Sequence, residues 1–302
     1  MKGLILICIA LFFLSGCGRN AEQDVETILA SELLESYGIA INRPQQPYHF
    51  IDGIEDLRLE VALYVRGEYG IYYFTPGGWN DRLIAQFVRI SEDGIRFAKD
   101  WLGYTGEPLI FIYNITEPDP DHPFPIWGGG GVLGSTTYIS MSVDLMPSLI
   151  VHEAVHAILR RQERQSNFPQ PPETSRWGWA QFLEEGLCDV IDFLFFMETE
   201  HNYDPNRYRR HRRDIQNHLH HEALNMLRFH NNFEDEAEFG HRYPKLMSNE
   251  TAASFIYFLL EHKGSVEDFM RVFEDIYLME EVFGESMEDM IVVWLTYLER
   301  FK

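Results

Sequence analysis

Apolar and polar positions divide this chain into a first half that mixes strands with a helix and a second half that is mainly helical. Residues 79–101 repeat apolar positions at helical spacing, and after Asp144 almost every segment shows the same period. Runs of β-branched and aromatic residues, bounded by Gly and Pro, predict strands elsewhere. The predicted strands are residues 57–64, 70–74, 109–115 and 132–143, the last of which is a strand or a hairpin.

This order of elements predicts an α+β fold. We expect a small N-terminal lobe of mixed α and β structure at residues 56–144 and a mainly helical lobe at residues 145–302. The helical segments of the second lobe include residues 179–196, 252–259, 266–277 and 292–298. Residues 17–55 are polar, carry prolines and one short helical pattern, and therefore indicate a tether and lead-in.

The first residues have the pattern of a secretory leader. A lysine follows Met1, an apolar run extends to Leu14, and small residues come next, which predicts a signal peptide at residues 1–16. The order Leu14-Ser15-Gly16-Cys17 resembles the bacterial lipobox, which implies cleavage before Cys17 and acylation of that residue. The alternatives are an ordinary signal peptide or a short uncleaved anchor. A lipidated Cys17 would tether the body to a membrane on its extracytoplasmic side, in the bacterial cell envelope.

Charge and cysteine content exclude several classes of protein. The 302 residues carry 25 basic and 47 acidic side chains, so the formal net charge is -22. This charge disfavours nucleic acid as a partner, because the phosphate backbone repels such a surface. Only three cysteines are present, and Cys8 lies in the predicted leader, so no disulfide framework is expected.

The strongest chemical signal is the segment His152-Glu153-Ala154-Val155-His156. Histidines four residues apart lie on one face of a helix and can bind one ion, and zinc suits this geometry. The intervening Glu153 then lies beside the metal-bound water as a general base. The helix is apolar on nearly all sides, so burial without an ion would leave costly polar groups. A catalytic zinc has three protein ligands, and a carboxylate from residues 179–196 can complete the set.

With these motifs, the chain resembles the gluzincin metallopeptidases, which combine H-E-x-x-H with a glutamate ligand on a following helix. The resemblance covers about residues 105–300 and implies a thermolysin-like zincin, with the zinc site between the two lobes. Phe182-Leu183-Glu184-Glu185-Gly186 matches with Glu185 as the third ligand of Zn²⁺. Asp189, four residues later, would then accept the other ring hydrogen of His152. If Glu184 were the ligand, Cys188 would occupy that place, which explains less.

The same resemblance implies further parts of an active site. A tyrosine precedes a helix of the A-x-S-F-x-x-x-L kind in part of the family, which makes Tyr243 the candidate for stabilising the oxyanion, with His241 as the alternative. Residues 132–143 resemble the edge strand along which such enzymes bind an extended peptide. Residues 128–131, all glycine, are either a mobile lip or a flexible turn. The spacing departs from the family, because 28 residues separate His156 from Glu185, and we interpret the excess as an insertion.

Together these patterns predict a membrane-tethered, extracytoplasmic zinc peptidase that cleaves peptide or protein substrates with metal-activated water. Glu153 would take the proton of that water and pass it to the leaving amine. The alternative is a lipoprotein without catalytic activity that uses the same scaffold as a binding or assembly module. The presence of Glu153 favours the enzyme, because a structural zinc has no use for that carboxylate.

Overall fold

The structure is a computed structural model of the whole chain. Its description covers residues 34–35, 39–43, 48–50, 59–115, 129–133, 136–141, 147–162, 179–199, 219–221, 223–225 and 249–301. The predicted signal peptide, Cys17, Tyr243 and His241 lie outside these residues. The predicted insertion between the two zinc-site helices, residues 163–178, lies outside them as well.

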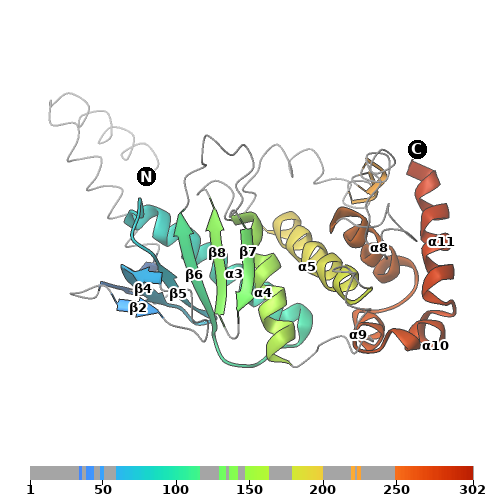
Figure 1. Ribbon diagram of the computed structural model, residues 1–302, viewed down its shortest axis with the longest axis horizontal. Coiled ribbons are helices and arrows are strands. Elements are labelled where there is room, and N and C mark those ends of the chain that lie inside the picture. The colour runs from blue at the N-terminus through green and yellow to red at the C-terminus, as the bar shows by residue number, and fades with distance from the viewer. Residues whose placement is uncertain are drawn as a thin grey trace, which may run out of the picture.

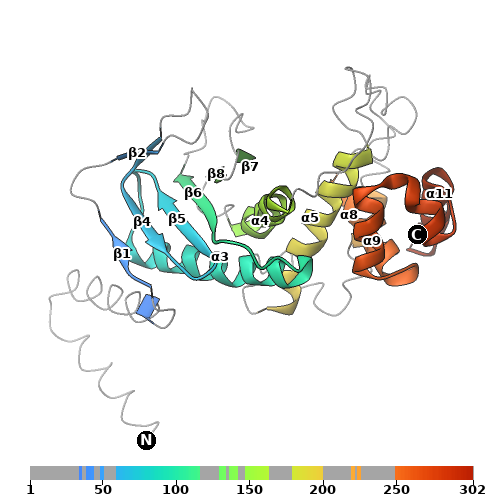
Figure 2. The ribbon, with the colours of Figure 1, turned by 90° about the horizontal axis from the view of Figure 1, so that it is seen from below.

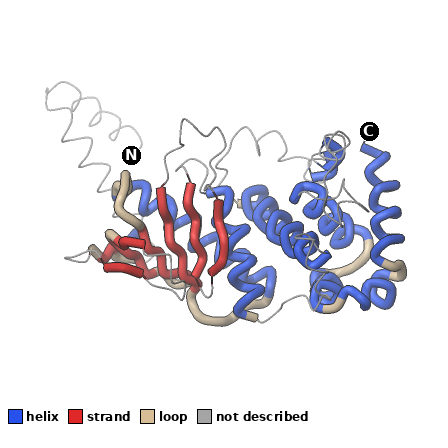
Figure 3. Tube along the Cα trace, viewed as in Figure 1, coloured by secondary structure: helices blue, strands red, loops and turns tan. Residues whose placement is uncertain are grey.

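A mixed six-stranded sheet forms the first part of the fold, and helices dominate the second (Figures 1 and 3). The predicted α+β class is therefore confirmed. The strand order is β1-β4-β5-β6-β8-β7, in which β5, β6 and β8 run parallel and the other pairs are antiparallel. A second, two-stranded sheet pairs β2 with β3. The strands are β1 (Ile41–Asn42), β2 (Tyr48–Phe50), β3 (Leu59–Val61), β4 (Leu63–Arg66), β5 (Gly70–Phe74), β6 (Leu109–Ile115), β7 (Gly129–Leu133) and β8 (Thr136–Met141).

Two strand predictions need correction. Residues 57–64 were expected to form one strand, but β3 and β4 divide this stretch and belong to different sheets. Residues 132–143 were expected to be the edge strand, but the described part of this stretch belongs to a hairpin, in which β8 lies inside the sheet and β7 lies at its edge. The edge strand is therefore made of Gly129–Leu133, and it begins with Gly129–Gly131, which were expected to belong to a lip or a turn.

A buried carboxylate fixes the turn between β4 and β5. Glu92 is 3% exposed and accepts hydrogen bonds from the backbone N–H groups of Glu68, Tyr69 and Gly70. The hydroxyl of Tyr72 donates to the same carboxylate. These charge-assisted bonds replace the water that Glu92 loses on burial, so the turn is fastened to the helix that carries Glu92.

That helix, α3 (Asp81–Leu102), has clear signals at both ends. Asn80 caps its start by accepting a hydrogen bond from the Leu83 N–H at 2.9 Å, and Gly103 ends it in the left-handed conformation at φ 63°. The apolar face of α3 packs against β5 and against α4. Gly94 permits the close approach to α4, because a Cβ there would lie 2.6 Å from Cγ2 of Val151.

The helices continue away from the sheet as a series of packed neighbours (Figure 2). Contacts link α3 to α4, α4 to α5 and α5 to α8, while α4 also touches β7 and β8. Within the described parts of the chain, no helix is both long and apolar enough to span a membrane. The helices beyond α3 whose bounds are described are α4 (Pro147–Arg161), α5 (Trp179–Glu198), α8 (Asn249–His262), α9 (Val266–Glu274), η3 (Ile276–Leu278), α10 (Met279–Phe283), α11 (Met287–Leu298) and η4 (Glu299–Phe301).

Candidate metal centre

Helix α4 carries the two histidines of the sequence motif and is buried on nearly all sides. It begins at Pro147, whose fixed φ and missing N–H suit the first turn, and it ends with Arg160 and Arg161 near the negative end of the helix dipole. His152 is 7% exposed and His156 is 8% exposed. Since α4 lies between the edge of the sheet and α5, both rings face α5.

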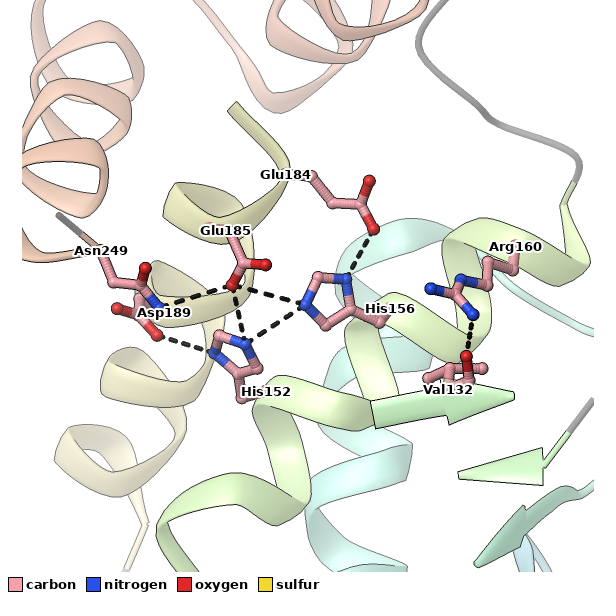
Figure 4. Close-up of polar contacts among 8 residues, drawn as sticks. All are labelled: Val132, His152, His156, Arg160, Glu184, Glu185, Asp189 and Asn249. Atoms are coloured by element: carbon pink, nitrogen blue, oxygen red, sulfur yellow. Dashed lines mark hydrogen bonds and ion pairs between the residues drawn. The ribbon is translucent and has the colours of Figure 1, made fainter. Parts of the chain in front are cut away.

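Three potential ligand atoms converge in front of α4 (Figure 4). The Nε2 atoms of His152 and His156 lie 3.2 Å apart. Oε2 of Glu185, from α5, lies 3.2 Å from Nε2 of His152 and 3.6 Å from Nε2 of His156. A tetrahedral zinc with bonds of about 2.0–2.1 Å separates its ligand atoms by about 3.3–3.4 Å. The triangle formed by His152, His156 and Glu185 therefore has the dimensions that a zinc ion requires.

The other ring nitrogen of each imidazole, Nδ1, forms a hydrogen bond with a second carboxylate. Oδ1 of Asp189 lies 2.7 Å from Nδ1 of His152, and Oε1 of Glu184 lies 2.6 Å from Nδ1 of His156. An ionised carboxylate only accepts hydrogen bonds, so each Nδ1 is the donor. In the neutral rings that a metal ion requires, the lone pairs are then on the Nε2 atoms, on the side that faces Glu185.

Close packing of α5 against α8 sets the position of Glu185. The next residue, Gly186, lies so near α8 that a Cβ on it would be 2.7 Å from the carbonyl carbon of Ala252. At the start of α8, Nδ2 of Asn249 donates to Oε2 of Glu185 at 3.4 Å. Glu185 is thus oriented by the histidines on one side and by an amide on the other.

Cys188 is a further donor beside the histidines. Its sulfur and one ring nitrogen from each of His152 and His156 all lie within 4.8 Å of one another. These three residues form a buried group that could hold a metal ion. Oε2 of Glu185 lies 3.2 Å and 3.6 Å from the two Nε2 atoms, and the histidines lower the pKa of its carboxyl, whereas burial raises the pKa of the Cys188 thiol. Glu185 and Cys188 are therefore both candidates for the third ligand, and the pKa shifts favour Glu185.

The field at this centre favours positive charge. Burial opposes charge on His152, but its hydrogen bonds to Asp189 and Glu185 outweigh burial and raise its pKa well above the usual value. The pKa of His156 is also raised, against burial, by side-chain hydrogen bonds with Cys188, Glu184 and Glu185. Burial alone would raise the pKa of Glu185, but the two histidines lower it well below its usual range. This electrostatic environment also suits a metal cation.

Glu153 lies on the side of α4 that faces the edge strand. It is 5% exposed, and burial raises the pKa of its carboxyl although His152 and His156 act in the opposite direction. Among the residues that the structure describes, nothing forms a hydrogen bond with its Oε2 atom. Such a buried, unsatisfied oxygen is a costly feature for a purely structural side chain and is common at functional sites.

The structure brings together four of the predicted site residues: His152, His156, Glu185 and Asp189. Sequence analysis missed the roles of Glu184 and Asn249. Glu184 was considered only as a rival ligand, although its place next to Glu185 on α5 already suggests that it can reach the histidines. Asn249 has no signal in the sequence, because it reaches the site only through the packing of α8 on α5.

No protein-family model matches this chain, and no curated protein matches it significantly.

Proposed function

We propose that this chain is a zinc-dependent peptidase of the gluzincin type, with a thermolysin-like arrangement and a lipid tether at Cys17. The observation that carries the proposal is the convergence of His152, His156 and Glu185 at distances of 3.2–3.6 Å beside Glu153, whose Oε2 atom has no hydrogen-bond partner among the described residues. His152, His156 and Glu185 would hold the ion, and Asp189 and Glu184 would orient the two rings.

Zinc supplies Lewis acidity to such a site, polarising a carbonyl and acidifying water. The chain's own residues account for the rest. Glu153 accepts a proton from the attacking water and delivers it to the nitrogen of the leaving amine. Burial raises its pKa, which makes the carboxylate a stronger base and its acid form available for the second transfer.

The edge of the sheet supports a peptide as the substrate. Among the described strands, β7 pairs only with β8, and its backbone groups other than the Val132 carbonyl, which accepts a hydrogen bond from Arg160, can pair with a strand from outside. An extended peptide can pair with the N–H and C=O groups of that edge. Since α4 packs against β7, a peptide bound there would pass close to the metal centre. Tyr243 stays the candidate for stabilising the oxyanion, and residues 1–16 stay the proposed leader.

Metal analysis and one substitution test the proposal. We expect the purified chain to contain about one zinc per molecule and to cleave members of a peptide library. Glu153→Gln should keep the zinc but lower kcat by about 10²–10⁴-fold, because a general base contributes that much. Glu198→Gln, on the exposed end of α5, is the matched control and should cleave like the native chain.

Three results would contradict the proposal. A chain purified without zinc, and unable to take it up, would exclude the ligand set. A zinc-loaded chain whose Glu153→Gln variant cleaves at the native rate would exclude Glu153 as the base. A zinc-loaded chain that cleaves no peptide would favour the alternative, a lipoprotein that uses the scaffold for binding or assembly.

A further inference from the structure

Gly130, on the edge strand, lies directly against the carboxylate of Glu153. A Cβ on Gly130 would lie 2.6 Å from both Cγ and Cδ of Glu153, far inside van der Waals contact. A real Cβ is essentially never found so close to another heavy atom. The Glu153 side chain therefore occupies the space that any other residue at position 130 would fill.

Glu153 provides an independent sign that this position serves a site. Glu153 is 5% exposed, and within the described parts of the chain its Oε2 atom has no hydrogen-bond partner. A buried carboxylate oxygen without a hydrogen-bond partner would reach solvent if its surroundings allowed it. Here it is kept between α4 and the backbone of β7 instead, where an outside strand would pass.

The neighbouring residues of β7 show that the close approach is local. Side chains alternate between the faces of a strand, so a side chain at position 131 would lie on the face opposite to one at position 130. A Cβ added to Gly131 would meet nothing within 4 Å. Val132 points to the same face as Gly130 and is buried. Its carbonyl accepts a hydrogen bond from Arg160 near the end of α4, which fastens the strand to the helix.

We propose that Gly130 is a positioning residue: its missing side chain leaves a slot in the edge strand that holds the Glu153 carboxylate beside the path of the bound peptide. This inference rests on the proposed function and deepens it. Gly130 contributes no group to the chemistry. It acts through Glu153, because the edge strand can lie close to the base only where it has no Cβ.

A thermal double-mutant cycle tests the contact without any substrate. Gly130→Ala should lower the unfolding midpoint by at least about 2 °C, as expected for overpacking, whereas Gly131→Ala should leave it nearly unchanged. In a Glu153→Ala background the effect of Gly130→Ala should disappear, because the obstructing side chain is gone. If the single variant fails to fold, the double variant should still fold. An undiminished effect in that background, or two unfolded variants, would overturn the proposal.

Kinetics test the consequence. Zinc-loaded Gly130→Ala should retain its metal and show kcat lowered by about 10²-fold with KM changed by less than about threefold, because the base is displaced but the edge still pairs. Gly78→Ala, outside the edge strand and with nothing within 4 Å of the added Cβ, should keep native kcat and KM. Equal kcat in the two variants would overturn the proposal. A native chain that holds zinc but cleaves nothing would instead refute the proposed function, while the thermal cycle would still decide whether Gly130 positions Glu153.

Discussion

Replacing Gly186 with alanine tests whether the packing of α5 on α8 controls the metal centre. The added Cβ would lie 2.7 Å from the carbonyl carbon of Ala252 and 2.8 Å from its oxygen, whereas ordinary contact begins at 3.4 Å. The two helices must therefore separate by about 0.7 Å, or α5 must rotate. Either movement displaces Glu185, the preceding residue, relative to His152 and His156.

Two opposing terms determine the effect on stability. Alanine is favoured over glycine inside a helix by about 1 kcal/mol. Overpacking costs about 1–3 kcal/mol, and here the obstacle is backbone, which cannot turn away as a side chain can. The cost therefore falls near the upper end of that range, and we expect a net destabilisation of about 1–2 kcal/mol. For a chain of this size that corresponds to a fall in Tm of about 2–6 °C.

Thermal unfolding measures the effect of Gly186→Ala on stability, and zinc retention during dialysis against a chelator measures its effect on the metal centre. Gly94→Ala is the matched control, since its Cβ would meet side chains and no backbone: it would lie 2.6 Å from a methyl group of Val151 and at ordinary contact distance, 3.7–3.8 Å, from the ring of Phe195. We expect a smaller fall in Tm for the control and unchanged zinc retention. A Gly186→Ala variant with native or higher Tm would refute the close packing of α5 on α8, and native zinc retention would refute its link to Glu185.

Two further predictions concern residues with well-defined partners. Asp189→Asn should weaken zinc binding by about 10–100-fold, because a neutral amide no longer supports the ring of His152, and a competitive chelator titration would reveal it; equal affinity in variant and native chain would contradict the bond. Burial, with His262 and His221 nearby, lowers the pKa of His220 to about 4. The folded chain therefore keeps this ring neutral, and the stability that the neutral ring contributes is complete above about pH 6.5 and is lost as the pH falls towards 4. Urea unfolding at pH 7 and pH 4 should show that the native chain loses about 3 kcal/mol more than His220→Gln, and parallel losses would contradict this.

The limits of the strand predictions have identifiable physical causes. Residues 70–74 and 109–115 were predicted with their observed ends, because Gly and Pro bound them and their apolar runs match burial in the middle of a sheet. Strand β7 was not, since three glycines have no side-chain pattern and only pairing with β8 makes them a strand. Nothing in the alternation of residues 57–64 marks the point where the chain passes from one sheet to the other.

For the helices and the site too, features set by local geometry were predicted and contacts between distant segments were not. The four-residue spacing of His152 and His156 fixes their common face, because helical geometry is local. The end of α9 was misplaced, as Ile276 and Tyr277 continue the apolar period in a 3-10 turn after Asp275 has already left the helix. The contacts of Gly130 with Glu153 and of Asn249 with Glu185 join segments far apart in sequence, so no local pattern announces them.

The half-paired strand β7 also bears on how copies of this molecule behave toward one another. A sheet margin with open backbone groups invites self-association, and many proteins block theirs with lysine, proline or a bulge. The residues of β7, Gly129–Leu133, include neither lysine nor proline. Electrostatic repulsion between copies can prevent this association instead, because each copy carries a formal net charge of -22. Added salt screens the charges and weakens the repulsion. This net charge thus opposes pairing between two copies without closing the margin to a less acidic strand.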